Sequence, residues 1–400
     1  MSMQDSRGPR LRLAMANAIL VLASLVVSGL LIFVVGEAYF RIKFGSAVDE
    51  TADTSLYEFD QQRGWRLKPG EYSRFSFGSH RAVDVSINEW GLRDRALDAA
   101  APAGTERVSV VGDSFVFAEA LNTPNRFSER LQNLAGPAYE VINISVPGYG
   151  TGQQFRLIDD LVSRGFQIGS KVILVFFTND IQDNLGLNYS SLKTDPLKPR
   201  FTVDGAGNLQ SINPTENKKG RGGKNFWVRS LFFNFLKRRI EVAATRFPEI
   251  FVALDTVGLA PNVPRTPGIV AGWYGSGWEE RWSATQDILG YVASYIETRL
   301  PGTELRIAFV PSPLQVEDVF KVMISRNLDA DPRYAEFFND IDRPQRMLRM
   351  FAEAQGIPFI DMTPALREAS GTYFPSEGHL SELGSEIAAR VLYDGAFGGR

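Results

Sequence analysis

The sequence predicts an α/β protein with a central parallel sheet of about five strands, preceded by one membrane-spanning helix. From Arg107 onward, short apolar runs alternate with helical segments, which is typical of a parallel sheet covered by helices. Near the N-terminus, residues 13–36 form an uncharged run. That run is longer than the roughly 20 helical residues that cross the hydrocarbon core of a bilayer.

The uncharged run favours an uncleaved anchor. A secretory signal has an apolar stretch of only about 7–15 residues and a small-residue cleavage site, and no convincing site of that kind follows Gly36. A buried helix of a soluble protein is the alternative. The flanking cations are Arg7, Arg10 and Arg12 before the run and Arg41 and Lys43 after it. This slight bias predicts a cytoplasmic tail (1–12), an anchor in the lipid bilayer (13–36) and a main domain outside the cytoplasm, in a single-pass membrane protein.

Composition excludes several classes of function. A net charge of −3 argues against a nucleic-acid partner. The absence of cysteine excludes disulfides, a thiolate nucleophile and cysteine-based metal sites. With only two histidines, His80 and His379, a multi-histidine zinc site is barely possible. We expect no metal and no cofactor.

The elements follow in order along the chain. Residues 37–104 are expected to form a linker and a small lead-in, in which a strand precedes a turn at Gly91. The main domain is expected over 105–398, with strands at 107–111, 139–145, 171–177, 304–310 and 357–361. Four helices are expected between and after these strands, and one of them ends at Gly356. The other three carry apolar stripes, which are Phe127, Leu131 and Leu134; Ile288, Val292, Tyr295 and Ile296; and Leu383, Ile387 and Val391.

A stretch rich in glycine, proline and basic residues, at about 188–277, reads as an insertion between the third and fourth strands. Its short helix at 224–239 clusters Trp227, Leu231, Phe235 and Leu236, and residues 215–246 hold nine Lys/Arg and two Glu, a net +7. Such a helix lies on an anionic membrane surface or packs on its own domain with its charges in water. The second alternative is the commoner one and is expected here.

Four polar motifs fall at or just beyond the carboxyl ends of predicted strands, the edge where open α/β sheets bind ligands. They are Gly112-Asp113-Ser114; the stretch containing Asn143, Gly148 and Gly150; Asn179-Asp180; and Glu377 with His379. Each has an ordinary explanation as a turn, a cap or a surface histidine. Their occurrence in order, each at its own strand end, favours catalysis.

The chemistry that these residues suit is acyl transfer. Ser114 is a candidate nucleophile that needs a base, and His379 is the candidate because His80 precedes the sheet. Glu377 is the nearest carboxylate that could orient the imidazole. The N–H of Ser114, the N–H of a turn glycine and the Asn179 amide could stabilise an oxyanion. Asp113 and Asp180 are expected to support them.

At these residues the chain resembles the SGNH (GDSL) hydrolases. "VVGDSF", the glycine of "NISVPGYGTG", "FTND" and the histidine of "SEGHL" look like blocks I, II, III and V of that family. The resemblance covers about 107–392 outside the insertion. It implies a flavodoxin-like three-layer sandwich, Ser114 as nucleophile, His379 as base, and Gly148 and Asn179 as partners of Ser114 in the oxyanion hole.

The chain departs from the family pattern at the acid. Most members have Asp three residues before the histidine, where this chain has Ser376, and the carboxylate here is Glu377. A D-x-H spacing occurs in the branch that resembles polysaccharide acetyltransferases. "SINEWGLRD" and the N-terminal anchor resemble a membrane-tethered bacterial subset of the family.

Three functions remain open from the sequence. The first is hydrolysis of an extracytoplasmic acyl ester, such as an O-acylated glycan. The second is acyl transfer onto a polysaccharide, with the acyl group delivered by a membrane donor protein. The third is a non-catalytic assembly factor. The aromatic residues Trp273, Tyr274, Trp278 and Trp282 suit a carbohydrate site or a core equally well.

Overall fold

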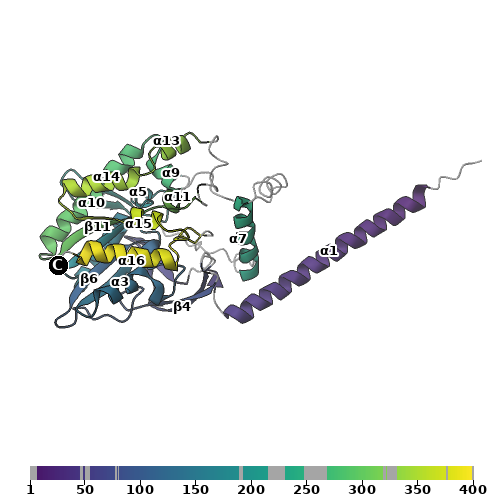
Figure 1. Ribbon diagram of the computed structural model, residues 1–400, viewed down its shortest axis with the longest axis horizontal. Coiled ribbons are helices and arrows are strands. Elements are labelled where there is room, and N and C mark those ends of the chain that lie inside the picture. The colour runs from purple at the N-terminus through teal and green to yellow at the C-terminus, as the bar shows by residue number, and fades with distance from the viewer. Residues whose placement is uncertain are drawn as a thin grey trace, which may run out of the picture.

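The structure is a computed structural model in which a long helix, α1 (Arg7–Phe44), projects from a mixed α/β body (Figure 1). It describes residues 7–45, 48–49, 55–76, 79, 81–188, 192–214, 230–246, 268–318, 321, 331–374 and 377–398. Residues 1–6 of the predicted cytoplasmic tail, His80, Trp227 and Ser376 lie outside the described residues. Within the described part, Met15–Phe44 is the candidate membrane span, and an 18-residue window of it has a mean hydropathy of 3.0 and contains no buried residue.

The body is built on a five-stranded parallel sheet in the order β12-β11-β8-β6-β7. The strands are β6 (Glu106–Gly112), β7 (Tyr139–Ser145), β8 (Lys171–Phe177), β11 (Glu304–Val310) and β12 (Phe359–Asp361). Numbered along the chain, the order is 2-1-3-4-5, which is the flavodoxin-like order. The predicted fold class and the five predicted strands are confirmed.

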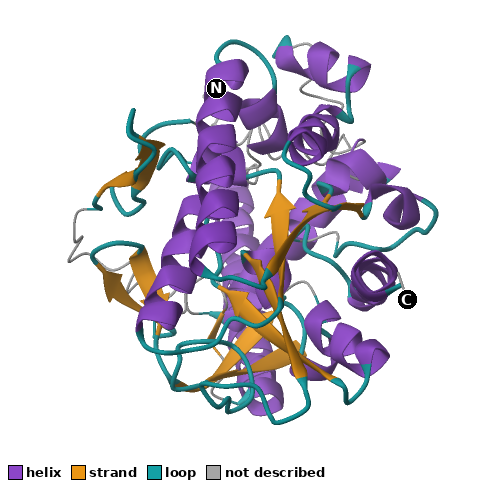
Figure 2. Cartoon of the chain, turned by 90° about the vertical axis from the view of Figure 1, so that its left-hand side faces the viewer, coloured by secondary structure: helices purple, strands orange, loops and turns teal. Residues whose placement is uncertain are grey.

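Helices cover both faces of the sheet (Figures 1 and 2). On one face α3 (Phe127–Ala135) packs against α16 (Glu382–Phe397), and on the other α10 (Trp278–Arg299) packs against α4 (Thr151–Ser163). The remaining helices of the body are α2 (Ser114–Phe117), η1 (Thr123–Asn125), α5 (Asp180–Asp183), α9 (Gly268–Trp273), α11 (Pro313–Val316), α13 (Arg333–Asn339), α14 (Arg343–Ala354) and α15 (Thr363–Arg367).

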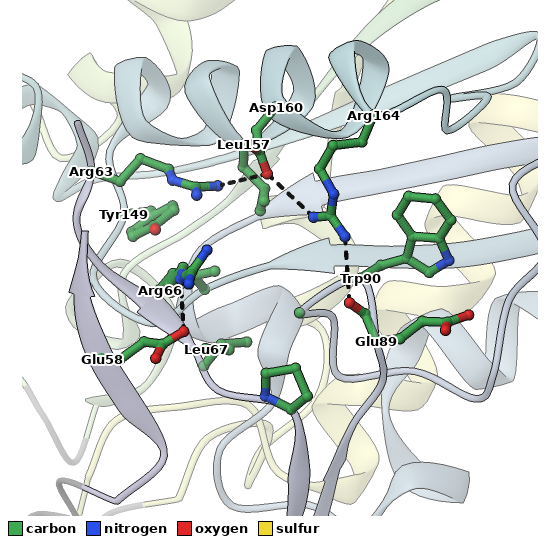
Figure 3. A pocket seen from close by; sticks show the side chains of 13 residues that line it. Glu58, Arg63, Arg66, Leu67, Glu89, Trp90, Tyr149, Leu157, Asp160 and Arg164 are labelled. Carbon is green, nitrogen blue, oxygen red and sulfur yellow. Dashed lines mark hydrogen bonds and ion pairs between the residues drawn. The ribbon is translucent and has the colours of Figure 1, made fainter. Parts of the chain in front are cut away.

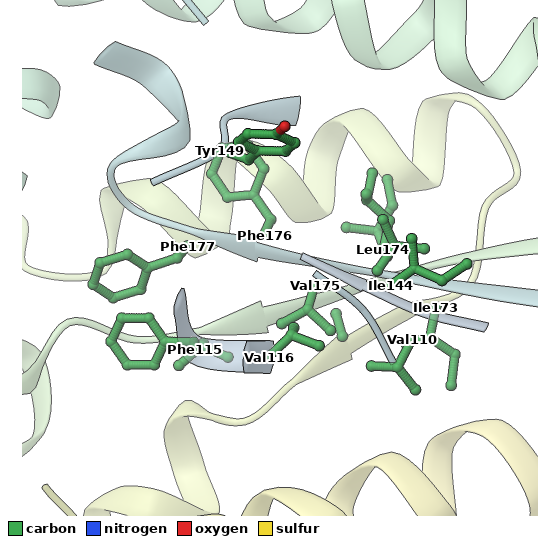
Figure 4. Packing of buried hydrophobic residues seen from close by; sticks show 14 of the residues in the cluster. Val110, Phe115, Val116, Ile144, Tyr149, Ile173, Leu174, Val175, Phe176 and Phe177 are labelled. Carbon is green, nitrogen blue, oxygen red and sulfur yellow. The ribbon is translucent and has the colours of Figure 1, made fainter. Parts of the chain in front are cut away.

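The core is a continuous apolar layer above and below the sheet. Figure 4 shows Val110, Ile144, Ile173 and Val175 packed along the strands, all of them almost fully buried. Burial on both faces explains why these strands read as unbroken apolar runs. Trp273, Tyr274 and Trp282 are also buried, at 0–3% exposure, so these aromatic residues belong to the core rather than to a sugar-binding surface.

The lead-in forms two small sheets that the sequence predicted only in part. β2 (Tyr57–Asp60) pairs with β3 (Gly64–Leu67), and β4 (Gly70–Ser76) pairs with β5 (Arg81–Ile87) and β1 (Val48–Asp49). The predicted strand is β5, and the predicted turn follows it at Gly91, whose φ is +78°. A further hairpin, β9 (Arg200–Val203) with β10 (Leu209–Ile212), lies inside the predicted insertion.

The basic helix of the insertion does not pack as predicted. α7 (Leu231–Arg246) lies against the C-terminal end of α1 (Figure 1). There, Leu231 is buried with Phe40 of α1 and Phe75 of β4 in a small second core. The packing of α7 against the anchor corrects the expectation that this helix rests on the main domain alone.

Two apolar stripes also differ from the prediction. On α16, Leu383 is 44% exposed, while Ala388, Ala389 and Leu392 are buried. The reason is close packing, since a Cβ at Gly384 would lie 2.0 Å from the Thr372 carbonyl oxygen, so only small residues fit at this start of the helix. On α3, Leu134 is 43% exposed.

Candidate active site

Ser114 stands at the carboxyl end of β6, where the backbone turns directly into the short helix α2. The turn is tight, because a Cβ at Gly112 would lie 2.4 Å from Val116 Cγ2. Asp113 caps α2 by accepting a hydrogen bond from the Phe115 N–H at 2.9 Å. The serine side chain is left partly exposed at the edge of the sheet.

His379, from the C-terminal part of the chain, contacts this serine. Its Nε2 lies 2.8 Å from Ser114 Oγ, within the range of a short hydrogen bond. The histidine sits in the loop before α16, where its carbonyl accepts the Phe374 N–H at 2.8 Å. Its ring packs on Phe115, with centroids 4.8 Å apart. The two predicted partners, 265 positions apart in the chain, are therefore brought together.

Glu377 faces the other nitrogen of the imidazole. Its Oε1 lies 3.8 Å from His379 Nδ1, which is beyond hydrogen-bond length but within ion-pair distance. Both atoms are buried and have no other hydrogen-bond partner among the described residues. Catalytic hydrogen bonds are often long in an unliganded site and shorten on binding. The carboxylate is thus placed where an orienting acid is needed.

Glu119 is a site residue that the sequence did not reveal. Its Oε2 lies 3.9 Å from His379 Nε2, on the side of the imidazole that faces the serine. Its Oε1 lies 3.6 Å from the guanidinium of the buried Arg74 on β4. The lead-in therefore places the guanidinium of Arg74 beside the Glu119 carboxylate, which in turn lies close to His379. No motif spacing predicts that contact, because it depends on how β4 docks beside α2.

Three carboxylates surround the histidine and change its ionisation. Burial favours the neutral ring, but Glu377, Glu119 and Asp113 outweigh it and raise the pKa of His379 to about 9. The imidazolium is therefore the dominant form at neutral pH in the unliganded site. A general base must be neutral, so catalysis through this ring is expected to increase with pH.

The predicted oxyanion donors follow three adjacent strands: Ser114 follows β6, and Gly148 and Asn179 follow β7 and β8, which flank β6 in the sheet. Gly148 has φ +76°, a conformation that glycine adopts without strain, and its turn is held by Trp65, whose Nε1 donates to the Pro147 carbonyl at 3.0 Å. Within the described part of the chain, no backbone carbonyl accepts from the N–H of Ser114 or of Gly148. Asn179 lies two residues beyond the end of β8, at the start of α5, and its amide lowers the pKa of the Asp113 carboxyl.

Asp113 and Asp180 are two buried carboxylic acids that lie close enough to affect each other's ionisation. Burial raises the pKa of Asp113 to about 6, although the Phe115 N–H and the charge of His379 oppose the rise. Burial and the neighbouring Asp113 and Asp183 raise the pKa of Asp180 well above its usual range. Asp180 also accepts from Thr151 Oγ1 at 3.3 Å. Asp113 therefore contacts the turn that carries Ser114, and Asp180 contacts α4, while their supporting roles stay predictions.

A buried arginine holds the nucleophile helix. Arg93, from the "SINEWGLRD" segment, donates to the carbonyls of Phe117 and Ala118 at the end of α2, both at 2.8 Å. It also donates to Leu121 at 2.8 Å and to Asp84 at 3.1 Å. Asn143, from the second motif, donates to the Val116 carbonyl at 2.7 Å and so also supports α2.

A cavity of about 240 Å³ lies between β3 and α4 (Figure 3). Its arginines are paired with acids, with Arg63 and Arg164 both contacting Asp160, and Arg66 contacting Glu58. None of the four motifs contributes a predicted catalytic side chain to its lining. We therefore do not assign the reaction to this cavity.

Comparison with known proteins gives similarity of structure only. No protein-family model matches the chain, and no curated protein matches it by sequence. The solved structures to which it is similar are hydrolases of the kind that the motifs resemble. One is a G-D-S-L family lipolytic protein from Desulfitobacterium hafniense, which is 14% identical with a TM-score of 0.33, and the match covers 72% of this chain and 100% of that one.

Two further structures are named for carbohydrate esters. The acetylxylan esterase of Geobacillus stearothermophilus is 12% identical with a TM-score of 0.35, covering 73% of this chain and 95% of its own. A carbohydrate acetylesterase family member from Sinorhizobium meliloti is 13% identical with a TM-score of 0.33, covering 72% and 95%. At such values the fold assignment rests on the strand order, and the site on its own geometry.

Proposed function

We propose that the protein is a serine ester hydrolase tethered to the bacterial inner membrane, acting on an acyl ester outside the cytoplasm. The observation that carries the proposal is the 2.8 Å contact between Ser114 Oγ and His379 Nε2 at the carboxyl edge of the sheet. The carboxylate of Glu377 on the opposite ring nitrogen completes a Ser-His-Glu arrangement.

The geometry supports the following sequence of steps. Neutral His379 takes the Ser114 hydroxyl proton at Nε2 while Oγ attacks the ester carbonyl carbon. The N–H groups of Ser114 and Gly148, with the Asn179 amide, stabilise the resulting oxyanion. His379 then returns the proton to the leaving alcohol, and an acyl-enzyme remains. Water, activated by the same imidazole, hydrolyses the acyl-enzyme and regenerates Ser114.

The substrate class follows from the surroundings of the site. Glu119 sits beside His379 Nε2, where the leaving alcohol must receive its proton, and this carboxylate is a ready acceptor for a neighbouring hydroxyl group. A polyhydroxylated alcohol, such as an O-acylated glycan of the cell envelope, suits that position. If a membrane donor protein supplied the acyl group and a glycan hydroxyl replaced water as the acceptor, the same acyl-enzyme would perform O-acyl transfer.

The direct test is p-nitrophenyl acetate hydrolysis by the full chain in detergent. Ser114→Ala and His379→Ala should each lower kcat by a factor on the order of 10⁴ or more, and the double variant should lose little beyond either single one. Ser163→Ala, an exposed serine on α4, is the matched control. Wild-type turnover by a folded Ser114→Ala protein would show that this serine is not the nucleophile.

A further inference from the structure

Helix α7 carries a stripe of exposed apolar side chains. Phe233, Leu236 and Ile240 are spaced i, i+3, i+7 and are 37%, 39% and 42% exposed. This spacing places them on one face of the helix. Three large apolar side chains exposed along one helix are costly in water, unless another apolar phase receives them.

The start of α7 is fixed to the anchor. Glu37 of α1 accepts the Phe232 N–H at 3.0 Å and the Ser230 hydroxyl at 2.8 Å, so its carboxylate caps the N-terminus of α7. The Phe232 ring lies 5.9 Å from the ring of Phe33. Phe235 packs on Phe40, with centroids 5.0 Å apart.

These contacts set the depth of α7 relative to a bilayer. The uncharged run ends at Gly36, so the first turn of α7 lies level with the last turn of that run. The exposed Tyr39 of α1 is at the same level, the position of interfacial aromatic residues in membrane proteins. The apolar surface of α1 thus continues sideways onto the stripe of α7.

Basic residues of α7 and α1 are found at the same depth. Lys237 and Arg239 are exposed on α7, and Arg41 and Lys43 end α1. Basic side chains on an amphipathic helix at this level suit anionic headgroups. We infer that α7 lies in the outer membrane–water interface, with Phe233, Leu236 and Ile240 in the acyl-chain boundary and its cations among anionic lipid headgroups. The inference rests on the membrane anchoring proposed above and does not depend on the reaction.

The test uses the absence of cysteine from the chain, which makes any introduced cysteine a single labelling site. Leu236→Cys and Ile240→Cys proteins, full-length and labelled with a polarity-sensitive fluorophore, are placed in nanodiscs with and without nitroxide-bearing lipid. Leu30→Cys, inside the uncharged run, reports on the anchor. Met350→Cys, an exposed apolar position on α14, is the matched control.

We expect lipid-nitroxide quenching at positions 236 and 240 to exceed that at 350 at least about twofold. We also expect stronger quenching with about one-third phosphatidylglycerol than with phosphatidylcholine alone. Quenching at 30 but not at 236 and 240 overturns the inference while leaving the anchor intact. Loss of quenching at all three positions overturns both. Protection from aqueous iodide without lipid quenching shows that protein covers the stripe, and equal quenching in both lipids overturns the role of charge.

Discussion

At the residue scale, the site combines a serine–histidine contact with an excess of negative charge. Ser114 Oγ and His379 Nε2 are already at hydrogen-bond distance, so little rearrangement is needed for proton transfer. The carboxylates of Glu377 and Glu119 approach the two ring nitrogens to 3.8 and 3.9 Å. In the proposed reaction they stabilise the imidazolium that forms during acylation, and they already favour the imidazolium in the unliganded site.

The dependence of kcat/KM on pH should show the effect of these carboxylates on His379. Because the pKa of His379 is raised to about 9, kcat/KM should increase with pH and level off above that value. Glu119→Gln removes a charge that raises the pKa, so its rising limb should move to lower pH. Glu353→Gln, on an exposed part of α14, is the control. A profile that is flat from pH 6 to 10, or unchanged in Glu119→Gln, would contradict this account of the histidine.

Both the negative charge of Glu377 and the length of its side chain should affect kcat. Glu377→Gln keeps the shape but loses the stabilisation of the imidazolium, and we expect kcat to fall by somewhat less than the roughly 10⁴ seen when a triad carboxylate is neutralised. Glu377→Asp keeps the charge and should retain partial activity. Steady-state kinetics with p-nitrophenyl acetate measure both. If Glu377→Gln turns over like the wild type, the site works as a serine–histidine dyad.

At the element scale, α2 is held by the segment that precedes the sheet. Arg93 satisfies carbonyls at the end of this one-turn helix, which cannot supply its own partners. Ala118, which ends the helix, has φ +58°, so the clamp also holds a left-handed residue that is not glycine. The lead-in is therefore part of the catalytic unit.

Arg93→Met should weaken that unit. Each buried carbonyl left without a donor costs about 1–3 kcal/mol, so we expect the free energy of unfolding to fall by at least about 3 kcal/mol. In the protein that remains folded, kcat should fall more than KM rises, because the serine loses its position. Urea unfolding and kinetics check the two effects, with Arg390→Met as an exposed control on α16. Unchanged stability and kcat would remove Arg93 from this role.

The same scale shows what could be predicted from sequence. Apolar runs located the five strands because buried parallel strands carry that pattern. The polar motifs pointed to the carboxyl edge of the sheet, where Ser114 and His379 are in contact, and the oxyanion roles of Gly148 and Asn179 stay predictions. The prediction for α16 was wrong only at Leu383, which is exposed, whereas Ile387 and Val391 pack against the core. Glu119 was not predicted because its place depends on tertiary docking.

At the scale of the whole molecule, one helix links the reaction to a compartment. α1 is long and apolar enough to cross a bilayer, and its end is built into the protein through Phe40, Phe75 and Leu231. If α1 is the membrane anchor that we propose, this packing holds the body of the protein close to the membrane surface. The natural ester is then expected to be one that reaches that surface.

Topology is the matching prediction. With residues 1–12 in the cytoplasm and all residues after about Phe44 outside, a C-terminal alkaline phosphatase fusion should be active in cells. A C-terminal green fluorescent protein, exported unfolded, should stay dark. Activity confined to the cytoplasmic reporter would reverse the orientation and exclude periplasmic glycans as substrates.

The central claim is that Ser114 is a nucleophile activated by His379. The most direct measurement is covalent labelling of the full chain with a fluorophosphonate, followed by peptide mass spectrometry. We predict one stoichiometric adduct on Ser114 that forms faster with rising pH, and that is lost in Ser114→Ala and greatly slowed in His379→Ala. An adduct on another residue, or none on Ser114 in folded wild-type protein, would contradict the account.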